Sequence, residues 1–145
     1  MKKIIEKYMA KEFKLTAPRL SILKFLEGNT SHPSAEDIYR EIKKVHPTVS
    51  FATVYNTLGA LKKMGEVLEL DIDPERRHYD PNTADHHHII CIKCHKIGDI
   101  FKDYSSIIRI PRNIERRIKV IGMNVNFYGV CYKCQGKKGS IKERR

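Results

Sequence analysis

Hydrophobic residues in the first half of the chain recur three or four positions apart, which predicts three amphipathic helices. Each predicted helix begins at a residue that can cap it, and these residues are Thr16, Ser34 and Ser50. Ser34-Ala35-Glu36-Asp37 also fits a capping box. The residues expected to face a core are Leu20, Leu23, Leu26, Ile38, Ile42, Val45, Phe51, Val54, Leu58 and Leu61.

After the third helix the pattern changes to alternation. Residues 66–71 alternate like a strand, Asp73-Pro74-Glu75 forms a turn, and Arg76-Arg77-His78-Tyr79 returns as a second strand. Three short helices followed by a hairpin are typical of a winged helix-turn-helix domain, which we place at residues 1–80.

A polar break over residues 81–85 separates this half from the rest, and we expect a hinge there. The later pattern predicts strands at residues 88–92, 97–101 and 124–130 and a helix at residues 110–121. We expect residues 86–145 to form a small α/β domain with an antiparallel three-stranded sheet and a basic tail. The chain as a whole is then α+β.

The chain carries a formal net charge of +11 and has an isoelectric point near 9.6. This excess favours a polyanionic partner, with nucleic acid before an anionic membrane, although charge alone also fits a solvated basic surface. No apolar run is long enough to cross a bilayer, and the charged N-terminus is unlike a signal peptide. We expect a soluble, cytoplasmic protein with no membrane partner.

The four cysteines form two Cys-x-x-Cys pairs, Cys91 with Cys94 and Cys131 with Cys134. In a cytoplasmic chain such pairs favour a metal over a disulfide, and tetrahedral Zn²⁺ takes two ligands from each pair. A redox dithiol needs a βαβ setting that the pattern lacks. We predict a structural Zn²⁺ that ties together a domain of about sixty residues, a size that a core alone rarely stabilises.

Three consecutive histidines precede the first cysteine pair. Because side chains alternate along a strand, His86 and His88 share a face and can bind one ion, whereas His87 points away. The nearby carboxylates are Asp80, Asp85 and Asp99. Imidazole with carboxylate suits Fe²⁺, Mn²⁺, Zn²⁺ or Ni²⁺, but a solvated polar turn is the alternative. His32, beside a proline, is by itself more typical of a structural residue.

Five segments together resemble the ferric uptake regulator family. They are Leu15-Thr16-Ala17-Pro18-Arg19, His32-Pro33-Ser34-Ala35-Glu36-Asp37-Ile38-Tyr39, Ser50-Phe51-Ala52-Thr53-Val54-Tyr55, His86-His87-His88-Ile89-Ile90-Cys91 and Tyr128-Gly129-Val130-Cys131. Each segment alone is weak evidence for the family, but the order and spacing of the five segments together are specific to it. The resemblance runs from about Leu15 to Cys134.

The resemblance implies a homodimer of winged-helix domains, hinged to a dimerisation domain that carries the structural zinc. It also implies a regulatory site for Fe²⁺ or Mn²⁺. By motif position the ligands of that site are His32, Asp80, His86, His88 and Asp99. An ion held by all five would favour one closed arrangement of the two halves. That arrangement would bind a palindromic operator in double-stranded DNA.

Two positions resemble the peroxide-sensing branch of the family. Asp99 stands where iron-uptake regulators typically carry glutamate, and Asn56 stands where they usually carry arginine. In the peroxide branch bound Fe²⁺ reacts with hydrogen peroxide, ligand histidines are oxidised, by analogy His32 and His86, and the protein releases DNA. The main alternative is an iron-, zinc- or manganese-responsive uptake regulator of the same fold.

The third predicted helix is the expected DNA reader. Its candidate contact residues are Thr53, Tyr55 and Asn56, which lie off the buried stripe. Arg19 and the hairpin pair Arg76-Arg77 are candidates for phosphate contacts. Phosphate contacts give affinity and salt dependence rather than sequence preference.

Two other classes of protein compete with this interpretation. Two histidines and one carboxylate also form the site of non-haem Fe²⁺ oxygenases, but the chain has no cosubstrate motif. A zinc-ribbon interaction module would leave the winged helix and His86-x-His88 unexplained. We therefore predict a metal-dependent transcriptional repressor and not an enzyme.

Overall fold

The computed structural model describes residues 2–9 and 13–136, and it divides after Thr83 into two compact units. We call the part up to Thr83 unit 1 and the part from Ala84 unit 2, and each is described by itself. The basic tail expected at the end of the chain lies outside the described residues. Among the helices that are described, none is both long and apolar enough to span a bilayer.

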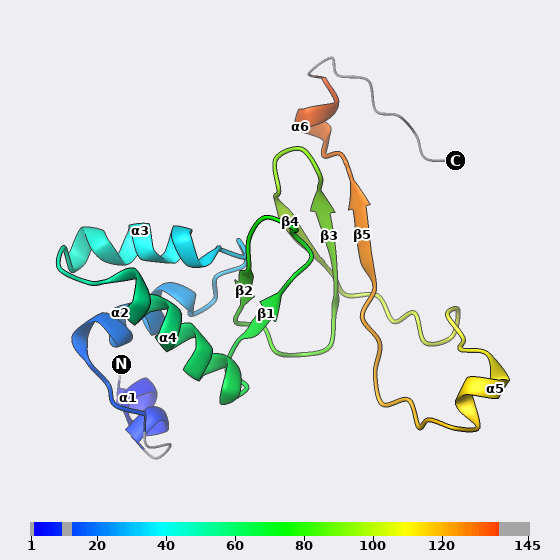
Figure 1. Cartoon of the computed structure of the whole chain (residues 1–145), viewed down its shortest axis with the longest axis horizontal. Helices are drawn as coiled ribbons and strands as arrows, with labels where there is room; N and C mark the ends of the chain where they lie inside the picture. The colour runs from blue at the N-terminus through cyan, green and yellow to red at the C-terminus, as the bar shows by residue number, and fades with distance from the viewer. Residues whose placement is uncertain (1, 10–12, 137–145) are drawn as a thin grey trace. The chain divides into compact units, whose positions relative to one another are not determined.

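In its described residues, unit 1 contains four helices and a two-stranded hairpin (Figure 1). The helices are α1 (Lys2–Met9), α2 (Ala17–Leu26), α3 (Ala35–Val45) and α4 (Phe51–Lys63). The strands β1 (Leu68–Leu70) and β2 (His78–Asp80) pair in antiparallel register. The three predicted helices and the hairpin are present, and α1 is an additional helix that precedes them.

The helices of unit 1 begin at the predicted capping residues. The Asp37 N–H donates to Ser34 Oγ at 3.1 Å, and the Ser34 N–H donates to Asp37 Oδ2 at 3.1 Å, so the predicted capping box is confirmed. Ser50 Oγ accepts from the Thr53 N–H at 3.1 Å. Thr16 occupies the N-cap position of α2 without a side-chain hydrogen bond.

The core of unit 1 packs apolar faces of α2, α3 and α4. Its buried residues include Ile22, Leu23, Leu26, Ile38, Ile42, Val54, Leu58 and Leu61. Two predicted core positions are wrong, because Val45 is 67% exposed and Phe51 is 40% exposed. Val45 ends α3 and Phe51 begins α4, so both lie at the margin of the packed faces. The Phe51 ring instead contacts the rings of Tyr39 and Tyr55, with centroids 5.5 and 6.2 Å away.

Unit 2 is built on a three-stranded sheet in the order β4-β3-β5 (Figure 1). Strands β3 (His87–Cys91) and β4 (Ile97–Ile100) are antiparallel, whereas β5 (Asn126–Gly129) runs parallel to β3. The prediction of an antiparallel sheet is therefore wrong, and the sheet is mixed. The reason is that β4 returns the chain to the end where β3 begins, and β5 then starts there and pairs with β3 rather than with β4.

The helix predicted over residues 110–121 is mostly absent. Of that stretch only α5 (Arg112–Glu115) is helical, and none of its residues is buried. The segment is rich in β-branched isoleucine, and short helices need a packed face to be stable. A second short helix, α6 (Tyr132–Gln135), follows β5 and was not predicted.

Candidate metal centres

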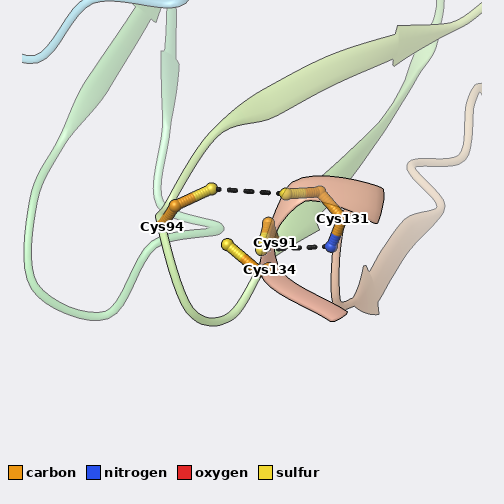
Figure 2. Close-up of side chains that lie close together, drawn as sticks. All are labelled: Cys91, Cys94, Cys131 and Cys134. Atoms are coloured by element: carbon orange, nitrogen blue, oxygen red, sulfur yellow. Dashed lines mark hydrogen bonds between the residues drawn. The ribbon is translucent and has the colours of Figure 1, made fainter. Parts of the chain in front are cut away.

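The four cysteines lie together in unit 2 (Figure 2). Cys91 ends β3, Cys94 lies in the turn before β4, and Cys131 and Cys134 lie at α6. The four sulfur atoms all lie within 4.8 Å of one another. The parallel register of β3 and β5 pairs Cys91 with Gly129, which brings the second Cys-x-x-Cys pair beside the first.

The spacing of the sulfur atoms fits Zn²⁺. Four sulfur ligands at about 2.3 Å from one ion, at tetrahedral angles, lie roughly 3.8 Å from each other. The Sγ atoms of Cys94 and Cys131 are 3.7 Å apart, and all four thiols are free of disulfides. Four thiolates are also a donor set that structural zinc sites use.

Backbone hydrogen bonds prepare one of these sulfur atoms for a metal. The Cys131 N–H donates to Cys91 Sγ at 3.3 Å. This hydrogen bond, together with one from the backbone of Cys94, lowers the pKa of the Cys91 thiol from 9.0 to about 6. The thiolate is the form of cysteine that binds metals, so these hydrogen bonds favour the ligating form of Cys91.

A second cluster in unit 2 consists of His86, His88 and Asp99. Asp99 on β4 is the register partner of His88 on β3, and His86 immediately precedes β3. The Asp99 Oδ1 atom lies 3.1 Å from His86 Nε2 and 3.5 Å from His88 Nε2. Both imidazoles are buried, and their ring centroids are 4.5 Å apart. Strand alternation thus brings the two imidazoles and one carboxylate to the same side.

His87 is engaged elsewhere. Its Nδ1 atom accepts a hydrogen bond from the Val125 N–H at 3.2 Å, and its ring centroid lies 5.2 Å from that of Tyr104. His87 therefore connects β3 to the chain that leads into β5, and it does not join the contacts made by His86 and His88.

Unit 1 contains a buried histidine–carboxylate pair. His32 precedes α3 and Asp80 ends β2, and His32 Nε2 lies 3.4 Å from Asp80 Oδ2. Their exposed fractions are 2% and 1%. Local sequence does not reveal this pair, because 48 positions separate the two residues and only the fold of the hairpin brings them together.

The donor types in both clusters suit a divalent first-row ion. Imidazole nitrogens and carboxylate oxygens favour Fe²⁺, Mn²⁺ or Zn²⁺ over softer ions. A buried carboxylate is costly unless it is paired with a cation or binds a metal, so the burial of Asp80 beside His32 also fits a metal site. Unit 1 supplies two such donors and unit 2 supplies three.

The predicted DNA-contacting residues lie at the surface of unit 1, with Thr53 and Arg19 partly buried there. The exposed ones are Tyr55 and Asn56 on α4 and Arg76 and Arg77 between β1 and β2. The hydroxyl of Thr53 lies 2.8 Å from that of Ser50. The Arg19 guanidinium lies 4.9 Å from the Phe13 ring centroid and donates to the Lys14 carbonyl at 3.0 Å.

A helical unit with a hairpin, followed by a unit with thiolate and imidazole–carboxylate clusters, is the arrangement expected of a metal-binding transcription regulator. Residues 10–128 match the model of the ferric uptake regulator family, and the chain belongs to this family. Its members are dimeric, DNA-binding regulators of transcription, so the chain is a regulator and not an enzyme.

Several known proteins are similar to the chain. The peroxide-responsive repressor PerR of Staphylococcus aureus (strain USA300) is 35% identical over 125 residues, which cover 86% of this chain and 84% of that protein. The structure of a peroxide stress regulator from Campylobacter jejuni has a TM-score of 0.64 at 33% identity, covering 92% of this chain and 98% of that one. The iron-containing ferric uptake regulator of Francisella tularensis has a TM-score of 0.69 at 30% identity, covering 86% and 96%.

Proposed function

We propose that this regulator is a metal-dependent repressor that senses hydrogen peroxide. The observation that carries the proposal is the cluster of His86, His88 and Asp99, in which a half-buried aspartate faces two buried imidazoles. Asp99 is the residue type of the peroxide-sensing branch. The similarity to a peroxide-responsive repressor supports the same assignment.

The regulatory site that we propose takes ligands from both units. His32 and Asp80 come from unit 1, and His86, His88 and Asp99 come from unit 2. We propose that residues 81–85 act as a hinge between the two sets. Neither set alone completes the coordination of an Fe²⁺ or Mn²⁺ ion. An ion that needs both sets stabilises only the arrangement that offers them together. To raise the population of that arrangement from 1% to 99%, the ion must bind it more tightly than the other arrangements by about 5.5 kcal/mol.

The response to peroxide depends on the ligand histidines. Fe²⁺ held by these residues would supply the redox chemistry by which hydrogen peroxide, as the two-electron oxidant, oxidises a neighbouring imidazole. In the net reaction one peroxide oxygen would enter a ring carbon–hydrogen bond and the other would leave as water. His32 and His86 are the candidate targets. Oxidation of His32 removes a donor of unit 1, which uncouples the DNA-binding unit from the metal and releases the operator.

The cysteine cluster has a separate, structural role in this proposal. Zn²⁺ held by Cys91, Cys94, Cys131 and Cys134 ties the β3–β4 turn to α6. It thereby anchors β3 and β4, the two strands that position His86, His88 and Asp99. The switching ion and the structural ion are therefore different, and only the first responds to peroxide.

Unit 2 also has the features of a dimerisation domain. In the described residues β5 pairs with β3 on one side only, so its other edge is open to a further strand. Several apolar side chains of this unit are exposed, among them Ile107, Ile118, Ile121 and Tyr128. A second copy of the chain would cover this surface.

A homodimer presents two copies of α4 to DNA, as a winged helix-turn-helix protein does on a palindromic operator. We propose that Thr53, Tyr55 and Asn56 on α4 contact base edges in the major groove. Arg19, Arg76 and Arg77 are proposed to contact phosphates. These arginines give affinity, whereas the α4 side chains give the sequence preference.

Oxygen mapping after peroxide exposure tests the proposal. A duplex selected by the Mn²⁺-loaded protein from a random DNA library serves as the operator. The protein is then loaded with Fe²⁺ without oxygen, bound to this duplex and treated with hydrogen peroxide. We expect release of the duplex and a gain of one oxygen atom in peptides containing His32 or His86. The Mn²⁺-loaded protein should neither gain oxygen nor release DNA.

The alternative function is metal sensing without oxidation, and the similarity to an iron-containing ferric uptake regulator favours it. It predicts that the Fe²⁺-loaded protein stays on the duplex after peroxide, with His32 and His86 unmodified. That result would contradict peroxide sensing and leave a metal-responsive uptake regulator.

A further inference from the structure

His78, on β2, is buried in unit 1 and uses both of its ring nitrogens. The Nδ1 atom lies 2.6 Å from the backbone carbonyl oxygen of His32, and the Nε2 atom lies 2.9 Å from Asp73 Oδ2. The carbonyl oxygen and the carboxylate oxygen each lie within hydrogen-bond distance of one ring nitrogen of His78. One imidazole thus joins the backbone of a proposed metal ligand to a buried carboxylate.

The backbone of His32 needs such support. Its φ angle is +50°, in the left-handed region that favours glycine and that other residues keep only when their surroundings hold them. The contacts around it come from β2. The Tyr79 N–H donates to the Pro33 carbonyl at 3.0 Å, and Ser34 forms an isolated bridge with His78. The His78 side chain contacts the backbone carbonyl of His32 itself.

Asp73 connects the His78 side chain to the turn between β1 and β2. It is 3% exposed, and its Oδ1 atom accepts from the Glu75 N–H at 2.9 Å while Oδ2 accepts from His78. The same turn continues into Arg76 and Arg77. The carbonyl of His32 is therefore linked through two side chains to the turn that carries the proposed phosphate contacts.

We propose that His78 is a positioning residue for the regulatory metal site. It holds His32 in the strained backbone conformation that keeps the His32 imidazole beside Asp80, and Asp73 in turn holds His78. This inference rests on the proposed function. Groups that orient metal ligands typically change metal affinity by 10- to 100-fold when they are removed, and we expect an effect of that size.

The experiment measures Mn²⁺ binding to the full-length, zinc-replete protein by titration. His78→Ala should weaken Mn²⁺ binding by about 10- to 100-fold and change the absorption spectrum of the Co²⁺-loaded protein. At saturating Mn²⁺ its affinity for the selected duplex should return to near that of the wild type, which a folding defect would not allow. Asp73→Ala should weaken Mn²⁺ binding, whereas Asp73→Asn, which keeps an accepting oxygen, should largely preserve it.

His46→Ala is the matched control. His46 is in the same unit, and its Nε2 atom makes a 2.9 Å hydrogen bond to Ser21 Oγ. The His46→Ala variant should bind Mn²⁺ with the same affinity as the wild type. Unchanged Mn²⁺ affinity in His78→Ala, or an equal loss in His46→Ala, would overturn the inference. If His78→Ala loses its helical circular dichroism, the Asp73→Ala variant provides the test in its place. Unchanged Mn²⁺ affinity in Asp73→Ala would then overturn the inference. A wild type that takes up no ion beyond zinc would instead refute the proposed function.

Discussion

The carboxylate of Asp99 lies 3.1 Å from the imidazole of His86, although the two residues are 13 positions apart. The contact exists because β3 and β4 form an antiparallel pair in which Asp99 faces His88. One carboxylate therefore reaches two imidazoles. The length of its side chain sets where its oxygen lies, and this makes Asp99 the position at which peroxide sensing and simple metal sensing can be separated.

Lengthening this side chain should separate the two responses. In Asp99→Glu the carboxylate remains, so we expect Mn²⁺-dependent binding to the selected duplex to stay within about threefold of the wild type. The rate of histidine oxidation in the Fe²⁺-loaded protein should fall by about tenfold or more, because the open coordination position changes. Oxygen incorporation by mass spectrometry gives the rate. Asp103→Glu, an exposed position in the same unit, is the control. Equal oxidation rates in the wild type and Asp99→Glu would remove Asp99 as the determinant.

Removing one cysteine should abolish the structural zinc site. In Cys91→Ser the ion loses the ligand whose pKa is lowered to about 6, and β3 loses its link to α6. We expect zinc content to fall from one ion per chain to near zero and the dimer to dissociate or unfold, as seen by metal analysis and sedimentation. Lys93→Ser changes the same turn without removing a sulfur and should keep zinc. A zinc-free Cys91→Ser protein that remains a stable dimer would show that zinc does not hold the domain together.

The sequence pattern predicts those parts of the structure that depend on neighbouring residues. The capping box of Ser34 and Asp37 follows from a three-residue spacing, and the shared face of His86 and His88 follows from strand alternation. The resemblance to a family, rather than any local pattern, named His32 and Asp80 together. Their 3.4 Å contact depends on how the hairpin folds back toward α3.

The features that the sequence did not reveal are those set by contacts between distant segments. Strand alternation predicts β3 and β5 but not which strands are neighbours, so the parallel pairing of Ile89 with Phe127 was missed. His78 and Asp73 lie in a segment that was interpreted only as a turn and a strand. Their burial is known only once β2 is placed beside the residues that precede α3.

The Ser34 cap should contribute measurably to the stability of unit 1. Ser34→Ala removes the acceptor for the Asp37 N–H at the start of α3, and loss of such a cap costs about 1 kcal/mol of unfolding free energy. Urea denaturation followed by circular dichroism measures this difference. Ser31→Ala, at an exposed serine outside the helix, is the matched control and should change the stability by less than about 0.5 kcal/mol. Equal values for the two variants would show that the cap adds nothing.

Truncating Tyr55 should weaken recognition of the selected duplex specifically. Its side chain is 49% exposed on α4 and its ring stacks beside Phe51, so the fold does not depend on its burial. Tyr55→Ala should cost about 1–3 kcal/mol of binding free energy on the selected duplex and much less on unrelated DNA. Fluorescence anisotropy with both duplexes measures this. Tyr132→Ala removes an exposed tyrosine of unit 2 and should change neither affinity. Wild-type affinity in Tyr55→Ala would contradict the assignment of α4 as the reader.

Removing a positive charge from the hairpin should weaken DNA binding without changing its sequence preference, unlike the truncation of Tyr55. Arg76 is exposed between β1 and β2, and an arginine bound to a phosphate contributes through counterion release rather than base recognition. Arg76→Ala should weaken binding to the selected duplex and to unrelated DNA by the same factor. The slope of log K against log salt should become shallower by about 0.9 for each phosphate that the variant no longer neutralises. Arg116→Ala removes an equal charge from unit 2 and should leave the slope unchanged. Weaker binding to the selected duplex alone would instead place Arg76 against a base edge, since only base contacts discriminate between sequences.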